Sequence, residues 1–443
     1  MKVIATNRSI LRLAFPILIA LQIPQISYLA NAVFLGHYGE AELRVIGVAG
    51  VFYLALSMVG YGLSNGMQIL MARRAGEQDP EGVTRTLSTG LLLSVGVSIS
   101  MILVALVFAP LIFGTSLRDS ENIRLSVSFL YQRVWGLPFL MLSQLFNAFF
   151  IAIQRSRFLI YGALAGTATN IILDYFLIFG YGPFPEMGLK GAALASVLAE
   201  VVTCIIMCTV YFFNRFQVTY PFQKHLYLNR KLAGNSLKIA TPLILQYIFS
   251  IGGWQIFFIY VEHLGNKELA ASQILRSMFG MIWVGIWAFA AASNTMVSNI
   301  IGQGKSRLVS YLTWKIARMS LIYAAAVCLP VFLFSRDLVS AFRNDPFLVE
   351  FAQPALHVVL ISTLVMSVST VVFNAVVGTG STLINMTIEI FCVVLYVLYC
   401  YIVIERMRLS LSWAWGSEFV YWSSLLLISF IFLRSGKWRG KNI

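Results

Sequence analysis

The chain has 443 residues, of which 59% are hydrophobic and only 11% are charged, whereas a soluble domain carries roughly 25% charged residues. This composition excludes an ordinary water-soluble domain. The formal net charge of +14 does not indicate a nucleic-acid partner, because the basic residues gather in particular loops, which is how membrane topology is encoded.

Apolar runs recur along the whole chain, and a run of about 20 residues is long enough to cross a bilayer. The first, from Leu13 to Leu35, is too long for the apolar core of a cleavable signal peptide, so we expect it to be the first span. Twelve spans are predicted, at residues 10–35, 45–74, 86–113, 123–153, 157–181, 187–213, 236–263, 269–302, 307–335, 346–378, 382–404 and 409–434. The predicted fold class is an all-α integral membrane protein with twelve transmembrane helices.

The two halves of the chain resemble each other. A shift of 226 residues places the segment from Leu11 to Pro16 on residues 237–242, His37 on His263 and Gly76 on Gly302. We therefore predict two pseudo-symmetric six-helix bundles, an N-terminal lobe at 1–213 and a C-terminal lobe at 236–443, joined by a cytoplasmic central loop at 214–235. Parallel duplications of this kind are typical of secondary transporters, whose substrate site lies near the membrane midplane between the halves.

Basic residues mark the even-numbered loops. The central loop contains Arg215, Lys224 and Arg230, and the C-terminal segment contains Arg434 and Lys437. Because positive charge is retained on the cytoplasmic side, we expect a multi-pass protein of the inner (plasma) membrane with both termini in the cytoplasm.

Ionisable side chains at bilayer depth are costly and mark functional sites by default. Asp174 lies in the fifth span with Asn170 one helical turn earlier, and this pair is a candidate site for a proton or Na⁺. Glu200 in the sixth span and Glu389 in the eleventh are candidate cavity acids. The alternative for each acid is a structural carboxylate that is neutralised by a buried arginine or lies closer to the membrane surface. Arg133 in the fourth span is expected to be a hydrogen-bond donor inside the bundle.

Other polar and aromatic residues within the spans are candidates for the substrate cavity. Gln68 and Arg133 carry hydrogen-bonding groups, although joining helices is the usual role of such side chains in membranes. Tyr61 and Trp254 offer aromatic faces to a flat cationic ligand.

No enzyme motif occurs in the sequence. It lacks a P-loop, an HExxH pair and a nucleophile elbow, and its four histidines lie far apart. We therefore expect no catalysis and no cofactor, with an ion gradient as the energy source, and no metal beyond Na⁺ at Asp174. The five cysteines lack a ligand set, so we expect small buried apolar residues.

The segment from Asn170 to Gly180, followed by Met187 to Ser196, resembles the signature of multidrug and toxic compound extrusion (MATE) transporters. Phe34-Leu35-Gly36 and the segment from Asn299 to Gly304 resemble this family as well, and the resemblance covers the whole chain. It implies an antiporter whose two bundles open a central cavity alternately to each side.

The resemblance also implies a cation cluster in the N-terminal lobe of the prokaryotic type. There, an Asp of the first span, an Asn and an Asp of the fifth, and a Thr of the sixth bind the coupling ion. Asn170 and Asp174 match the fifth-span pair, Ser196 replaces the Thr, and Asn31 stands in place of the first-span Asp. The seventh-span acid of the NorM branch is not matched, because Ser250 occupies that place.

The predicted function is secondary antiport of organic, cationic or neutral, drug-like substrates in exchange for H⁺ or Na⁺, by a monomer whose partners are small molecules and lipid. One alternative is a flippase for lipid-linked saccharides from the same wider superfamily, in which cavity cations would meet a phosphate. Another is a membrane sensor or scaffold that does not transport.

The topology can be tested with single cysteines placed in a variant without native cysteines. Cysteines near Lys224 and Lys437 should react with an impermeant thiol reagent only from the cytoplasmic side, and one near Pro183 only from outside. Labelling of all three from the same side would contradict the arrangement of twelve spans.

Overall fold

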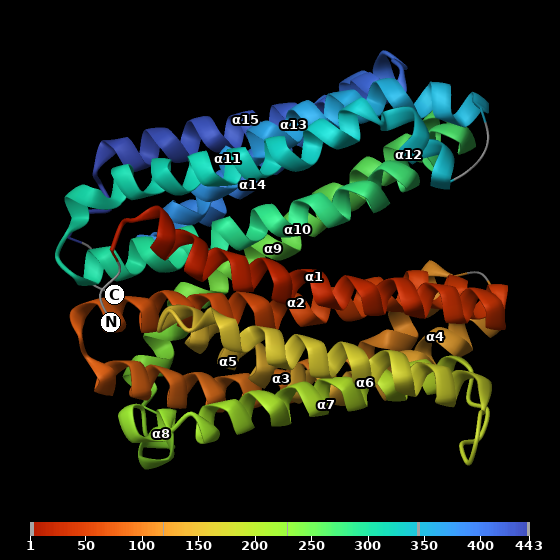
Figure 1. Cartoon of the computed structure of the whole chain (residues 1–443). Helices are drawn as coiled ribbons and strands as arrows, with labels where there is room; N and C mark the ends of the chain where they lie inside the picture. The colour runs from red at the N-terminus through yellow and green to blue at the C-terminus, as the bar shows by residue number, and fades with distance from the viewer. Residues whose placement is uncertain (1–3, 118, 228, 343–345, 441–443) are drawn as a thin grey trace. The chain divides into compact units, whose positions relative to one another are not determined.

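The computed structural model describes residues 4–117, 119–227, 229–342 and 346–440. Among these residues, twelve helices are long and apolar enough to cross a membrane, so the predicted all-α fold with twelve spans is confirmed (Figure 1). The first half comprises α1 (Asn7–Tyr38), α2 (Glu40–Glu77), α3 (Pro80–Ser116), α4 (Ser120–Arg133), α5 (Leu137–Ala152), α6 (Leu159–Phe179), α7 (Leu189–Phe213) and α8 (Phe216–Thr219). The second comprises α9 (Arg230–Leu264), α10 (Asn266–Gly302), α11 (Val309–Leu333), α12 (Ser335–Phe342), α13 (Pro346–Gly378), α14 (Thr382–Cys400) and α15 (Leu411–Ser435).

The helices form two compact units. One, the N-lobe, runs from Phe15 to Ile244, and the other, the C-lobe, contains residues from Leu245 onward together with the start of α1 up to Ala14. The division therefore falls inside α9, whereas the sequence predicted it within the loop at 214–235.

Two contacts explain why the central loop and the start of α9 belong to the N-lobe. The Ser88 hydroxyl donates to the Phe222 carbonyl oxygen at 3.0 Å, which holds the loop on α3. Gly66 of α2 leaves room for α9, because a Cβ atom at this glycine would lie 3.0 Å from the Cβ of Ala240.

Each lobe has an apolar core of its own. Phe113 and Leu130 belong to the core of the N-lobe, and Phe257, Phe279 and Trp415 belong to that of the C-lobe. The fourth span of each repeat is central: α5 contacts α2, α3 and α7, and α13 contacts α10, α11 and α15.

The fourth span is interrupted at Val134–Gly136, where one turn of 3₁₀-helix separates α4 from α5. Pro138 follows in the first turn of α5, and its ring and missing N–H disfavour a continuous α-helix through this turn. The tightened turn directly follows Arg133, a cation that is paired with Glu200.

Arg133 of α4 pairs with Glu200 of α7, with nitrogen–oxygen distances of 2.8 and 2.6 Å. The Tyr53 hydroxyl donates to both carboxylate oxygens at 3.0 and 3.1 Å, and the guanidinium lies 3.9 Å from the centre of the Tyr53 ring. The two charges thus compensate each other inside the N-lobe, which matches the structural alternative for Glu200.

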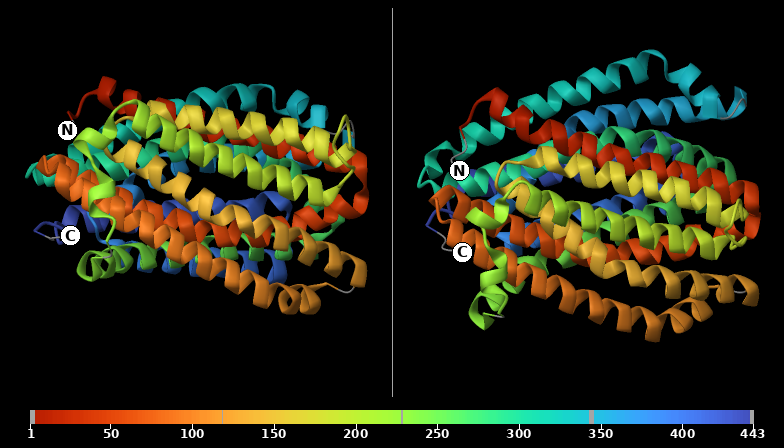
Figure 2. Two further views of the ribbon diagram at one scale, coloured as in Figure 1. Left: turned by 90° about the horizontal axis from the view of Figure 1, so that it is seen from below. Right: turned by 60° about the horizontal axis from the view of Figure 1, so that its bottom comes forward.

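α6 and α7 pack side by side along their lengths (Figure 2). α6 ends at Phe179, and the following residue, Gly180, has a left-handed φ of 70° that suits glycine. Gly191 near the start of α7 faces the α6 backbone, where an added Cβ would lie 2.5 Å from the Leu177 carbonyl oxygen. The Gly-rich connection therefore sets the close approach of these two helices.

Gly191→Ala should destabilise the protein by about 1–3 kcal/mol, because backbone atoms of α6 cannot move aside as a flexible side chain can. The measurement is the melting temperature of the detergent-solubilised protein. Gly96→Ala on α3 is the matched control, since no atom lies within 4 Å of its added Cβ. An equal response of the two variants would contradict the close packing.

Glu200→Gln should destabilise the protein by about 3 kcal/mol, because it leaves the Arg133 guanidinium inside the lobe without its counter-charge. Removing both charges, in Arg133→Gln with Glu200→Gln, should recover part of this loss in a double-mutant cycle of melting temperatures. Arg124→Gln is the control, since its pair with Glu121 is exposed and worth little. Additive effects of the substitutions at Arg133 and Glu200 would contradict the pairing.

Candidate functional site

A cluster of amide and hydroxyl groups joins α1, α6 and α7 within the N-lobe. Its centre is Asn170, whose Oδ1 accepts hydrogen bonds from the Ser27 hydroxyl and, at 3.3 Å, from Asn31 Nδ2. Asn170 Nδ2 donates to the Ser196 hydroxyl at 3.3 Å. The structure therefore brings Asn31, Asn170 and Ser196 together and adds Ser27, which the sequence analysis missed although it lies one turn before Asn31.

Asp174 lies one turn beyond Asn170 on α6 and is fully buried, with 0% of its surface exposed. Among the described residues, neither of its carboxylate oxygens has a hydrogen-bond partner, and the same holds for Asn31 Oδ1. Arg133 exerts an electrostatic influence on Asp174, but its guanidinium donates its hydrogen bonds to Glu200. Within the part of the chain that the structure describes, three buried oxygen atoms of this region are thus without donors.

The chemistry of this donor set suits a small cation. Carboxylate and amide oxygens are ligands of hard metal ions, and a carboxylate without partners can instead take up a proton. A buried charge without a partner is costly, so occupancy by H⁺ or Na⁺ would remove an existing penalty.

Glu389 lies in the C-lobe, on α14. The Tyr421 hydroxyl of α15 donates to Glu389 Oε1 at 2.6 Å, and Ser250 of α9 is a second hydrogen-bonding neighbour. Ser250 occupies the place of the seventh-span acid that this sequence lacks. It therefore lies beside Glu389, an acid from another helix.

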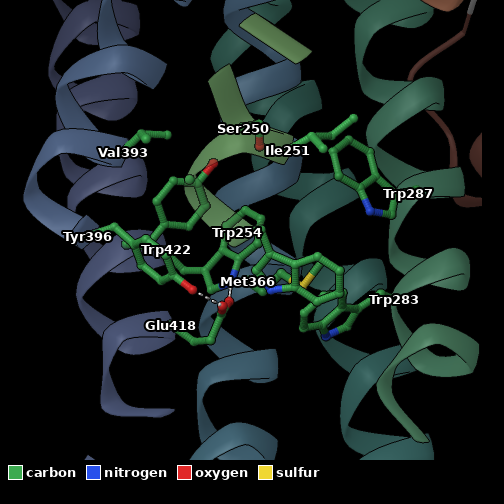
Figure 3. A pocket seen from close by; sticks show the side chains of 12 residues that line it. Ser250, Ile251, Trp254, Trp283, Trp287, Met366, Val393, Tyr396, Glu418 and Trp422 are labelled. Carbon is green, nitrogen blue, oxygen red and sulfur yellow. Dashed lines mark hydrogen bonds between the residues drawn. The ribbon is translucent and has the colours of Figure 1, made fainter. Parts of the chain in front are cut away.

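Trp254 lines a C-lobe cavity of about 150 Å³ (Figure 3). Glu418 of α15 also lines it and was missed by the sequence analysis, although an acid within an apolar span signals a site by the same rule that selected Asp174. Its Oε1 accepts from the Tyr396 hydroxyl at 3.3 Å, and its Oε2 accepts from the Trp422 indole at 2.9 Å.

The remaining candidates lie on α2 of the N-lobe. Tyr61 is 36% exposed, whereas Gln68 is buried. Both side chains make further interactions, as expected of polar groups within a helical bundle.

Comparison with known proteins places the chain in a family. The MatE family model matches it twice, at residues 16–176 and 242–402, which is more than half of its length. A probable multidrug resistance protein NorM of Thermotoga maritima is 23% identical over 452 aligned positions, which cover 99% of this chain and 94% of that protein.

Solved structures share the fold. A crystal structure of MATE in complex with MaL6 superposes with a TM-score of 0.89 at 18% identity, covering 96% of this chain and 95% of the other. A transporter of the MOP superfamily from Pyrococcus furiosus gives a TM-score of 0.88 at 18% identity with the same coverage. The double match of the family model along the repeat shows that this chain belongs to the MatE family of membrane transporters.

Proposed function

We propose that the protein is a secondary antiporter that exports organic substrates, cationic or neutral and drug-like, in exchange for H⁺ or Na⁺ by alternating access. The observation that carries this proposal is Asp174, a fully buried carboxylate without hydrogen-bond partners among the described residues, beside the Asn31–Asn170–Ser196 cluster. A structural acid would be expected to have partners, as Glu200 has.

The relatives support the cargo class. The probable multidrug resistance protein NorM of Thermotoga maritima aligns with 99% of this chain, and a multidrug export protein MepA of Staphylococcus aureus aligns over 84% of it. We extend this cargo class to the present chain, in the plasma membrane and with both termini in the cytoplasm.

The ion must bind one conformation of the transporter more tightly than the other in order to drive exchange. A tenfold bias requires about 1.4 kcal/mol of differential binding. A single buried carboxylate can have a compensating cation in one conformation and lack it in the other. The resulting difference in free energy is larger than this amount. One site in the N-lobe is therefore sufficient for coupling, although Asn31 provides an amide where the family pattern has a second acid.

A flippase for lipid-linked saccharides would need cavity cations to receive a phosphate. Arg133, an in-span cation of the N-lobe, is already paired with Glu200. Asp174, Glu389 and Glu418 instead add negative charge within the spans, which favours cationic cargo.

Asp174→Asn should abolish uphill export while leaving the fold intact, because the amide keeps the shape of the side chain but neither titrates nor carries charge. The measurement is flux of a panel of cationic dyes in proteoliposomes under imposed proton and sodium gradients. Asp174→Glu should retain partial activity with a shifted pH profile.

Asp337→Asn on α12 is the matched control, because this carboxylate is exposed, and its flux should equal that of the wild type. A well-folded Asp174→Asn protein that exports at the native rate against a gradient would refute the coupling role. Absence of flux in the wild type under every gradient would favour a non-transporting protein, and accumulation of a lipid-linked sugar in a deletion strain would favour the flippase.

A further inference from the structure

The C-lobe cavity is walled mainly by aromatic rings. Four indoles and two phenols line it together with the Glu418 carboxylate (Figure 3); the aromatic residues are Trp254, Trp283, Trp287, Tyr396, Tyr421 and Trp422. Its volume of about 150 Å³ is below the roughly 300–1,000 Å³ of pockets that enclose whole drug-sized ligands. The cavity therefore has room for a small head group.

The internal repeat relates this cavity to the Asn170 cluster of the N-lobe. The two segments matched by the family model, 16–176 and 242–402, differ by a constant shift of 226 residues. The same shift relates the left-handed residues that precede α6 and α14, Gln154 and Gly380. It places Tyr396 at the position of Asn170. The tyrosine whose hydroxyl donates to Glu418 therefore replaces the central amide of the N-lobe cluster.

The last span of each repeat supports the same correspondence. α7 and α15 both contain 25 residues and begin 222 residues apart, at Leu189 and Leu411. Counted from these starts, Glu418 occupies the position of Ser196. Each lobe thus places its cluster between equivalent helices, with Ser196 beside Asn170 in one and Glu418 beside Tyr396 in the other.

The two clusters nevertheless differ in chemistry. The N-lobe offers amide and carboxylate oxygens that can ligate a bare ion, and its acid is Asp174 on α6. The C-lobe position equivalent to Asp174 is Cys400. The C-lobe acid, Glu418, lies instead on α15, among aromatic rings. Aromatic rings around a carboxylate attract an organic cation. The rings can also pack against the apolar surface of such a cation, which a bare metal ion does not have.

Charge supports an organic cation as the occupant. None of the ion pairs among the described residues involves Glu418 or the neighbouring acid Glu389. Arg276 lies 5.3 Å from the centre of the Trp254 ring, which shows that this ring already receives a cation, but Arg276 does not line the cavity. The walls therefore contain a carboxylate that has no paired cation among the described residues and that a cationic ligand can compensate.

Two unused donors specify the ligand further. The buried indole nitrogens of Trp254 and Trp283 have no hydrogen-bond partner among the described residues. An oxygen atom on the ligand close to its cationic centre would accept from such a donor, as the hydroxyl of an amino alcohol does.

We propose that this cavity is a binding site for a small organic cation, a quaternary ammonium or protonated amine head group bearing an oxygen acceptor. Glu418 supplies the counter-charge, and the rings of Trp254, Trp283, Trp287 and Trp422 supply the cation–π faces. As a binding site it stands independently of transport, whereas its role in recognising cargo rests on the proposed export function.

The test uses choline and its neutral isostere dimethylbutanol, in which a tert-butyl group replaces trimethylammonium. Both are titrated into the purified full-length protein in nanodiscs, and binding is followed by calorimetry and tryptophan fluorescence. Choline should bind saturably and at least about tenfold more tightly than the isostere. Equal affinities of the two probes would overturn the proposal, as would the absence of choline binding.

Variants locate the site. Glu418→Gln removes the charge but keeps an acceptor for the Trp422 indole, while its NH2 group can donate to the Tyr396 hydroxyl. It should weaken choline binding at least about tenfold with little change for dimethylbutanol. Trp287→Leu should weaken choline binding as well. If Glu418→Gln melts at a lower temperature than the wild type, Trp287→Leu is the variant that tests the site. The control Trp413→Leu removes an exposed ring of the same helix as Glu418 and should bind choline as the wild type does. Wild-type affinity in well-folded Glu418→Gln and Trp287→Leu variants would overturn the assignment.

Asp174→Asn separates this proposal from the proposed function. It should still bind choline while losing gradient-driven export. A wild type that exports dyes but binds no choline would refute only the C-lobe site, and one that binds choline but drives no export would refute only the transport function. Loss of choline binding in Asp174→Asn would place the choline site at the N-lobe cluster and overturn the present assignment.

Discussion

The cost of keeping a carboxylate inside a membrane-spanning bundle governs the arrangement of polar groups in this protein. A buried charge needs a counter-charge or hydrogen-bond donors, and four acids within the spans meet this requirement to different extents. Glu200 has Arg133 and Tyr53, Glu389 has Tyr421, and Glu418 has two neutral donors. Asp174 has no hydrogen-bond donor among the described residues.

This gradation distinguishes acids that hold the fold together from acids that are available to a ligand. The Glu200 pair is complete, so an added ion or substrate would have to displace a guanidinium. Asp174, Glu389 and Glu418 differ from it, because they have neutral donors or none and no paired cation among the described residues. The distinction follows from partners in three dimensions, which explains why span position alone could not rank these residues.

The sequence was sufficient to predict the fold class and the number of spans, because each span carries its own apolar signal and the repeat confirms the register. It also predicted Asn170 and Asp174 as a pair, since a polar group is conspicuous within an apolar helix, and the family resemblance added Ser196. The packing of the start of α9 on α2 was harder to predict, because the contact of Gly66 with Ala240 shows only when these two helices are packed.

Other parts of the two clusters were beyond the sequence for physical reasons. Ser27 is a small hydroxyl of a kind that occurs throughout the spans, and only its bond to Asn170 sets it apart. The pairing of Arg133 with Glu200 joins residues 67 positions apart, and no local pattern encodes it. Glu418 was visible as an in-span acid, but its aromatic surroundings come from helices far apart in the chain.

The two clusters, taken together with the proposed function, give a physical reason for obligatory exchange. A transporter that changed conformation with both sites empty would move two uncompensated carboxylates, Asp174 and Glu418, through changing surroundings of low polarity. On the two proposals, an inorganic ion at the first site or an organic cation at the second would each remove one of these penalties, so the empty transition would be the slow one, and binding of one ligand at a time would give exchange rather than co-transport. Coupling then requires only that the two ligands favour opposite conformations, because such a difference in affinity is reciprocal between sites. The repeat provides the same framework of helices for both clusters. Equivalent helices hold an oxygen-lined cluster in the N-lobe and an aromatic cluster in the C-lobe.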